Sequence, residues 1–330
     1  MKSLYASTAI LVLCLAGCGG GGGSSGGGTT VISAPAPSPS PSSSPSPSPT
    51  STPTPTPVYK KFVDLTGDQD FKTACSSFVI NGSPPPITPT TAFGGGLSVT
   101  YAASSSSYTL SGDGITRTFG PADAVTPLPA GAAASYARAN GTTTERFIIG
   151  APTAGGVALD YGRGLSLTVL KSPLTNYNCV FGVPTLLSDA PATTSVTFSK
   201  TSIAGVLYQL PPSAAQNAYT LNDSVVTLSV NLVTGAVNVT VHLIGTLQTP
   251  GGPSTTGVDL GTISGTGTID AVAGSYTGTF SDAGGVLPAS SFGGWFFGPQ
   301  GKEAAFAYSF MRVDSSGAQQ TSSGKIFAIQ

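Results

Sequence analysis

The sequence predicts an all-β protein, in which an irregular β-rich region precedes an antiparallel β-barrel of approximately eight strands. After residue 58, apolar side chains recur at every second position over short runs, which is the period of a strand with one buried face. Gly, Pro, Asn and Asp separate these runs, and no run has the period of an amphipathic helix. Closing such a sheet into a barrel would also remove its exposed edges.

The clearest element lies between residues 225 and 243. Apolar residues alternate with polar ones from 226 to 232, and the alternation resumes from 237 to 243 after Thr234-Gly235. Two alternating runs joined by a glycine-containing turn are typical of a β-hairpin. One face of this hairpin is apolar and the other polar, which predicts a sheet with one solvated side.

Shorter runs on both sides of this hairpin complete the predicted strands. In the C-terminal part they lie at 195–199, 205–210, 257–263, 274–280, 294–297, 304–312 and 324–328. In the N-terminal part, between long Pro- and Gly-containing loops, they lie at 71–80, 97–102, 108–111, 146–149 and 165–170. We therefore expect an irregular β-rich domain at 58–190 and the barrel at 191–330.

The first residues have the organisation of an export signal followed by a tether. A basic start and a short apolar stretch end at Leu15-Ala16-Gly17-Cys18, which resembles the lipobox of bacterial lipoproteins. The resemblance implies a signal peptide at 1–17 and lipidation of Cys18 by acyl chains such as palmitate, which would anchor the chain to a membrane without crossing it. An ordinary signal peptide with an incidental Cys18 is the alternative. Residues 18–57, rich in Gly, Ser and Pro, form the predicted tether.

The composition excludes several classes of function. Charged residues make up 8% of the chain and the net charge is -1, with no basic run, so we expect no nucleic-acid partner. No later segment is long and apolar enough for a membrane-spanning helix. We also expect no enzyme, catalytic residue, cofactor or metal, because His242 is the only histidine and occupies a polar strand position. Asp64, Asp68 and Asp70 are interpreted as turn formers, with a calcium site as the alternative.

Two cysteines are available for a disulfide. Cys14 leaves with the signal peptide and Cys18 is taken by lipid, which leaves Cys75 and Cys179 in an oxidising export pathway. A disulfide between them would close a loop of about 100 residues and stabilise the fold by up to about 5 kcal/mol in the chain-entropy model. Two free buried thiols are the alternative.

A family resemblance rests on the stretch from Gly294 to Glu303. With Phe296, Gly298 and Pro299, this stretch resembles the signature of the transferrin-binding-protein-like β-barrel lipoproteins. The order of lipobox, tether, irregular β region and terminal barrel also resembles one lobe of such a protein. The resemblance implies a handle-like domain at 58–190 and a structural role for the signature. For the Glu303 carboxylate we expect hydrogen bonds to backbone amides at a turn, with a contact to a bound partner as the alternative.

The chain departs from that signature in ways that bear on packing. Ala305 and Phe306 occupy the positions of a Gly-Gly pair, so Phe306 must find room beside a neighbouring strand. The resemblance implies an outer-membrane, surface-exposed lipoprotein of a Gram-negative bacterium, an address that Gly19 after the lipobox also favours. It would bind an extracellular protein or a small solute through barrel and handle loops. The alternative is a structural envelope lipoprotein with no specific soluble ligand.

Overall fold

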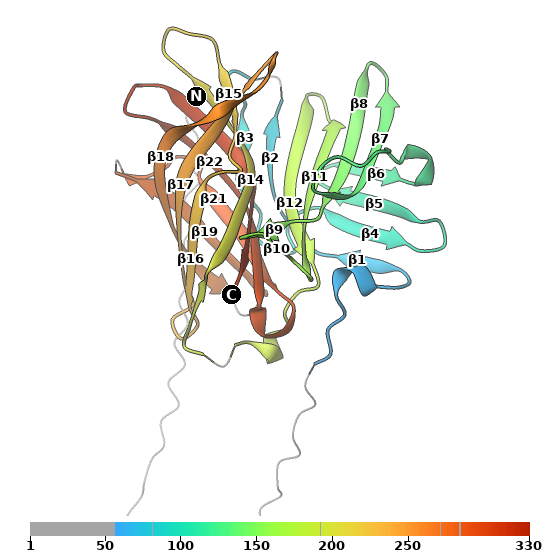
Figure 1. Ribbon diagram of the computed structural model, residues 1–330. Coiled ribbons are helices and arrows are strands. Elements are labelled where there is room, and N and C mark those ends of the chain that lie inside the picture. Colours follow the sequence, from blue (N-terminus) through green and yellow to red (C-terminus); the bar gives the residue numbers. More distant parts are fainter. Residues whose placement is uncertain (1–56, 81, 192, 271, 284) are drawn as a thin grey trace, which may run out of the picture. The chain divides into compact units, whose positions relative to one another are not determined.

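Strands account for nearly all the regular structure of the described residues (Figure 1), as predicted. The computed structural model describes residues 57–80, 82–191, 193–270, 272–283 and 285–330. Cys18 and the predicted signal peptide and tether up to residue 56 lie outside these residues. Within them, no helix is long and apolar enough to cross a membrane. The described residues belong to one compact unit, Thr54–Gln330, and the predicted division at residue 190 stays a prediction.

The N-terminal half contains two antiparallel sheets that share one hydrophobic cluster. One sheet has the order β1 (Gln69–Phe71), β4 (Ser98–Ala102), β5 (Ser107–Gly112), β6 (Ile115–Phe119). The other has the order β3 (Ile87–Thr88), β2 (Ala74–Val79), β12 (Leu174–Gly182), β11 (Gly162–Leu170), β8 (Thr143–Gly150), β7 (Ala132–Asn140). A short pair, β9 (Thr153–Ala154) and β10 (Val157–Ala158), lies apart from both. Phe147 joins the two larger sheets, because its ring centroid lies 5.5 Å from that of Tyr108 and 5.5 Å from that of Phe119.

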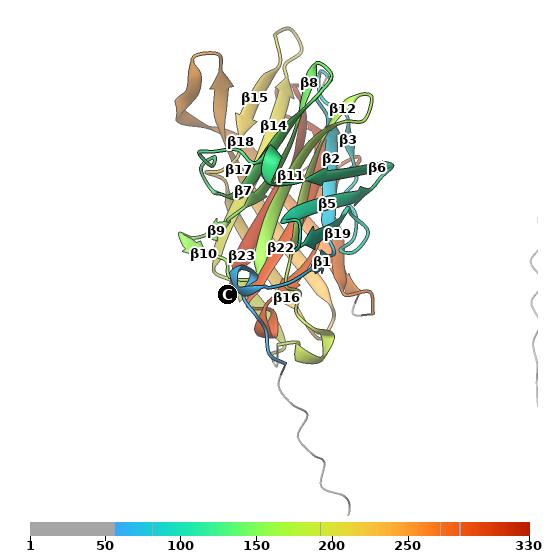
Figure 2. The ribbon, with the colours of Figure 1, turned by 90° about the vertical axis from the view of Figure 1, so that its right-hand side faces the viewer.

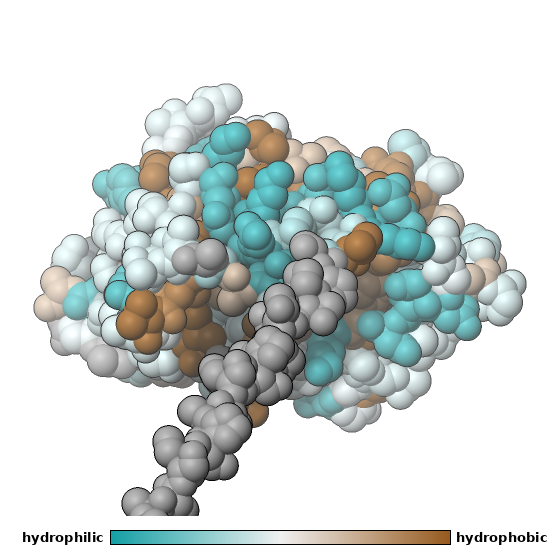
Figure 3. Space-filling model, turned by 90° about the horizontal axis from the view of Figure 1, so that it is seen from below, coloured by the Kyte–Doolittle hydropathy of each residue, from teal (hydrophilic) through white to brown (hydrophobic). Residues whose placement is uncertain are grey.

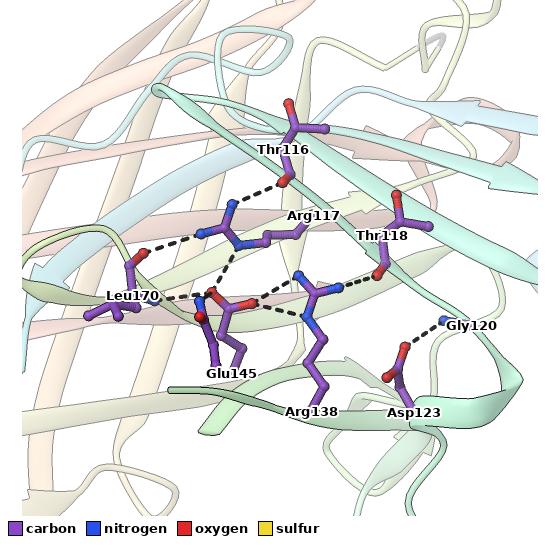
Figure 4. Close-up of polar contacts among 9 residues, drawn as sticks. Thr116, Arg117, Thr118, Gly120, Asp123, Arg138, Glu145 and Leu170 are labelled. Carbon is purple, nitrogen blue, oxygen red and sulfur yellow. Dashed lines mark hydrogen bonds and ion pairs between the residues drawn. The ribbon is translucent and has the colours of Figure 1, made fainter. Parts of the chain in front are cut away.

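A buried carboxylate also links these two sheets (Figure 4). Glu145 of β8 forms ion pairs with Arg117 of β6 at 2.9 Å and with Arg138 of β7 at 3.0 Å, and it accepts a hydrogen bond from Asn140. Burial alone would raise the pKa of Glu145, but the hydrogen bonds from both arginines and Asn140 lower it below its ordinary value. Glu145 is therefore ionised, and its ion pairs hold the two sheets together.

The C-terminal half forms an eleven-stranded antiparallel sheet that closes on itself. Its strands are β13 (Ser195–Phe198), β14 (Lys200–Leu210), β15 (Asn217–Thr220), β16 (Val225–Asn231), β17 (Ala236–Thr249), β18 (Gly252–Asp270), β19 (Ser275–Asp282), β20 (Gly285–Val286), β21 (Ser291–Phe297), β22 (Glu303–Val313) and β23 (Gln319–Ile329). Eight of them form the ring, in the order β17, β15, β14, β23, β22, β21, β19, β18 and back to β17. The predicted hairpin at 225–243 is formed by β16 and the first part of β17.

Aromatic side chains fill the barrel, and glycines on facing strands make room for them. Fully buried rings come from Tyr276, Phe280, Phe292, Phe306, Tyr308 and Phe310. Gly294 pairs with Phe306, and a Cβ added at Gly294 would lie 2.6 Å from the Phe306 Cβ. Phe306 therefore has room beside the neighbouring strand because Gly294 has no side chain. An eight-stranded barrel is just wide enough for its side chains to fill it.

Strands β22 and β23 are buried on both faces, because the six-stranded sheet covers their outer side. The Ser323 hydroxyl lies 2.8 Å from that of Ser76 and accepts a hydrogen bond from Asn178. Lys325 Nζ donates to the Leu165 carbonyl oxygen at 3.0 Å and to Ser166 Oγ at 2.6 Å. Burial lowers the pKa of Lys325 to about 7. The contact between the two halves therefore includes a buried, polar section.

The barrel has two unlike ends. The C-terminal end carries the turns at 232–235 and 298–302 together with Gln330, and it lies at the bottom of Figures 1 and 2. The first described residues reach this end, where the Tyr59 hydroxyl accepts a hydrogen bond from the Leu186 amide. The far end carries the turns at 211–216 and 314–318.

Candidate functional site

A polar pocket of about 740 Å³ opens at the far end of the barrel. Gln209 at the end of β14, Leu260 in β18, Arg312 in β22 and Gln320 in β23 line it, together with Asp314 in the turn that follows β22. The strands of the barrel converge here and their loops surround the opening. Mouths of β-barrels are common positions for ligand sites.

Arg312 is the buried charge of this pocket. Its side chain follows Phe306, Tyr308 and Phe310 on the inner face of β22, and only 7% of its surface is exposed. The guanidinium donates to Gln320 Oε1 at 2.7 Å and to the carbonyl oxygen of Leu260. Burial lowers the pKa of Arg312 below its ordinary value, while the negative charges of Asp282 and Asp314 act in the opposite direction.

Carboxylates and amides hold the rim of the pocket in place. Asp314 Oδ2 accepts hydrogen bonds from Gln209 Nε2 at 2.9 Å and from Gln320 Nε2 at 3.0 Å. Burial would raise the pKa of Asp314, but hydrogen bonds from Ser316, Gln209 and the backbone lower it, so the group is ionised. At the outer edge, His242 Nε2 lies 3.1 Å from Asp259 Oδ1, and the pKa of Asp259 is lowered by hydrogen bonds from the Gly261 amide and from His242.

This arrangement suits recognition of polar groups. It presents one deeply placed guanidinium and several oriented amide and carboxylate groups within a single open hollow.

Among the described residues, no three His, Cys, Asp or Glu side chains lie together as a metal site would require. Asp68 accepts a hydrogen bond from the Ala103 amide and Asp70 accepts one from Thr100, so both hold the β1–β4 region.

The two cysteines predicted to pair do so. Cys75 in β2 and Cys179 in β12 face each other in the register of the six-stranded sheet and form a disulfide. They lie 104 residues apart in the sequence. The bond therefore fastens neighbouring strands of the N-terminal half and lies apart from the far-end pocket.

Glu303 lies at the C-terminal end and is buried, with 3% of its surface exposed. Its carboxylate accepts three backbone hydrogen bonds, from Asp160 at 2.6 Å, Tyr161 at 3.0 Å and Gly162 at 2.7 Å. Burial raises the pKa of Glu303, and the three amides offset part of this effect. Backbone amides were expected as partners, but they come from the N-terminal half rather than from the turn beside Glu303. The carboxylate thus connects the two halves of the protein.

The other signature residues surround the same end. Phe296 points into the barrel, where its ring stacks on Phe198 with centroids 6.2 Å apart. Gly298 has a φ of +73°, and a Cβ there would lie 2.3 Å from the ring of Tyr161. Pro299 follows and begins a short 3-10 turn, Pro299–Gly301. Gly298 therefore combines a left-handed backbone with a close approach that a side chain would prevent.

The far-end pocket was not among the sites predicted from the sequence. One signal was available, because Arg312 continues the alternation of Phe306, Tyr308 and Phe310 and so takes an inward position in the strand. A charged residue at an inward-facing strand position indicates a buried polar site. The partners Gln209, Leu260 and Asp314 carry no comparable signal in the sequence.

The fold and the pocket define an all-β protein with a closed barrel and a polar barrel mouth. No family model and no curated protein sequence matches the chain. Similar solved structures include transferrin-binding protein B of Haemophilus parasuis, with 12% identity over 78% of this chain and 45% of that chain at a TM-score of 0.39. The same protein of Neisseria meningitidis has 13% identity over 78% of this chain and 44% of that chain, at a TM-score of 0.38.

A third similar structure is HpuA of Kingella denitrificans in complex with human haemoglobin, with 13% identity over 82% of this chain and 95% of that chain at a TM-score of 0.32. The chain thus spans less than half the length of the two transferrin-binding proteins that it resembles. These likenesses are distant and do not assign the chain to a family.

Proposed function

We propose that the chain is a lipid-anchored outer-membrane protein that binds an extracellular protein or a small solute at the far end of its barrel. The observation that carries this proposal is the polar pocket in which Arg312 is buried beneath a rim of amides and carboxylates. A guanidinium held in a fixed position recognises hydrogen-bond acceptors with defined geometry. The carboxylates of Asp259, Asp282 and Asp314 also line the pocket and would accept hydrogen bonds from donor groups of a ligand. The pocket would therefore select a ligand by its polar groups.

The position of the first described residues supports this orientation. Tyr59 bonds to Leu186 at the C-terminal end, whereas the pocket opens at the opposite end of the barrel. If Cys18 carries the lipid, the predicted tether joins the protein at the end that lies away from the pocket. The loops of the far end would then face away from the membrane and be accessible to a partner.

Binding rather than catalysis is the role that the contacts favour. Arg312 and Asp314 are each engaged by glutamine side chains, so their positions are set before a ligand arrives. Preorganised donors and acceptors reduce the entropy that binding costs. We propose no reaction for this site and no cofactor.

A structural role is the second candidate, and the filled barrel favours it. Aromatic side chains occupy the interior, and the six-stranded sheet covers the outside of β22 and β23. A protein built in this way could act as a rigid spacer in the envelope without any soluble ligand. The two candidates differ in whether saturable binding exists at the far end.

A binding experiment with a blocked pocket separates them. Ser315 is an exposed pocket residue, so Ser315→Trp should fill the opening, whereas Thr256 is exposed on a neighbouring hairpin and does not line the pocket. We would measure binding of purified transferrin, haemoglobin and a panel of small cationic, zwitterionic and anionic solutes. The proposal expects saturable binding that Ser315→Trp weakens at least tenfold and Thr256→Trp preserves. Absence of saturable binding would favour the structural role.

The location requires separate measurements. Mass spectrometry of the mature protein should show acyl chains on Cys18, and protease treatment of intact cells should remove the barrel while a periplasmic control survives. Protection of the barrel until the envelope is broken would confine it to the periplasm, provided that the released barrel is cleaved. An unmodified N-terminus would refute the anchor.

A further inference from the structure

The C-terminal end of the barrel carries an apolar surface that the proposed binding function does not use. Leu186, Leu187, Val233 and Val272 are 50%, 52%, 75% and 93% exposed. We call these four residues the apolar rim. Figure 3 views the protein from this side and shows hydrophobic surface there. The first three line a hollow of about 510 Å³ that also contacts Trp295.

Large exposed apolar residues are distributed unevenly over the protein. The described residues include eleven of them, and five of these are the apolar rim and Val58. Val58 precedes Tyr59, whose hydroxyl is bonded to the backbone of Leu186. Single exposed apolar residues are common on protein surfaces, but a gathered patch marks a surface that contacts something apolar. The patch lies where the described chain begins.

We propose that the apolar rim rests on the surface of a phospholipid bilayer, with its side chains inserted among the outermost acyl segments. This inference rests on the proposed anchor at Cys18, because the anchored segment enters the protein beside the rim. A tether that joins the protein at this point holds the rim near the membrane at high effective concentration. Four aliphatic side chains, borne on two turns and on the segment before the barrel, can enter the interface together.

The charges at this end indicate which lipids the rim would contact. Lys60, Lys61, Lys200 and Lys302 lie at this end together with Asp64, Asp160, Asp189 and Asp270. Lys61 forms an ion pair with Asp160 at 3.0 Å, and Asp189 accepts a hydrogen bond from the Gln300 amide. The positive and negative charges therefore balance, and this end carries no net basic charge of the kind that selects anionic lipids. The contact should therefore form on zwitterionic phosphatidylcholine and be insensitive to salt.

Trp295 provides a specific reporter, because it is the only tryptophan in the chain and lines the hollow. The acylated mature protein would be reconstituted in vesicles of phosphatidylcholine or of its acyl-chain-dibrominated form. Bromine quenches indole fluorescence only at short range. We expect the brominated vesicles to reduce Trp295 emission by at least half relative to the unbrominated ones.

Matched variants test whether the apolar rim causes this effect. Leu186→Ser with Leu187→Ser and Val233→Ser should abolish the quenching while the acyl anchor still carries the protein into the floating vesicle fraction. The control combines Val225→Ser, Val258→Ser and Val313→Ser, which are 56%, 39% and 61% exposed and lie outside the hollow. In the control variant, the brominated lipid should quench Trp295 emission as strongly as in the unchanged protein.

The failures of the two proposals are distinguishable. Flotation without quenching, or quenching that survives loss of the rim, would overturn the docking and leave the anchor intact. Failure to float together with an unmodified Cys18 would overturn both. Trp295 emission that changes with protein concentration in the absence of lipid would assign the rim to a second copy of the chain. Trp295 emission that changes in the absence of lipid when residues 35–56 are deleted would assign the apolar rim to the chain's own proline-rich segment. Either result would refute the lipid contact.

Discussion

Replacing Lys325 with methionine should stabilise the protein at neutral and mildly acidic pH. Lys325 lies between the barrel and the six-stranded sheet, is 7% exposed, and donates hydrogen bonds to Leu165 and Ser166. Both acceptors are neutral, so these bonds replace only part of the hydration that the ammonium group loses on burial. Methionine has a similar length and removes the charge.

The magnitude follows from the pKa of Lys325. Burial lowers this pKa from 10.5 to about 7. The unfolded chain therefore binds more protons than the folded one between these values, and the free energy of unfolding rises with pH across that window. At about 1.4 kcal/mol for each tenfold change in proton affinity, the full rise approaches about 5 kcal/mol. Below pH 7 the side chain is charged in both states, and its destabilising effect is complete.

Urea unfolding at a series of pH values from 6 to 9.5, followed by Trp295 fluorescence with the disulfide intact, measures this dependence. The unchanged protein should gain stability steadily above pH 7. The free energy of unfolding of Lys325→Met should depend less on pH and should be higher at pH 6 than that of the unchanged protein. Lys200→Met, at an exposed position, should behave as the unchanged protein does. Lower stability of Lys325→Met at pH 6 would refute the reasoning, because the buried charge would then be net stabilising.

Three further changes test the contacts that hold the fold. Replacing Cys75 and Cys179 with alanine should lower the free energy of unfolding by up to about 5 kcal/mol, seen as a lower urea midpoint, since the bond closes a long loop; an unchanged midpoint would contradict this. Glu145 has a pKa lowered by its arginine partners, so the protein should lose stability as the pH falls from about 4.5, and Glu145→Gln should weaken that acid dependence while being less stable at pH 7. Gly298→Ala should cost about 3 kcal/mol or more in a thermal melt, because it adds a clash with a tyrosine ring to an unfavourable φ. Gly114→Ala, with a φ of +74° and open space, should cost only about 1 kcal/mol.

Sequence periodicity located the strands that have one solvated face. The runs at 225–231 and 236–243 alternate because the barrel core covers one side and water the other, and they form β16 and β17. β12 was missed because nearly all its residues are buried, so its sequence does not alternate. β7 was missed because alanines occupy five of its nine positions and leave little contrast between its two faces.

The sequence by itself determined the all-β class, the strands with one wet face and the pair of cysteines that can bond, since each depends on local pattern or on residue chemistry. Only the tertiary structure decided which groups meet at the far-end pocket, which amides Glu303 binds and why Lys325 is buried. Arg312 meets Leu260 across 52 residues, and Lys325 meets Leu165 across 160. Such contacts are set by how the sheet closes and how the two halves pack, and neither is encoded in the neighbours of any one residue.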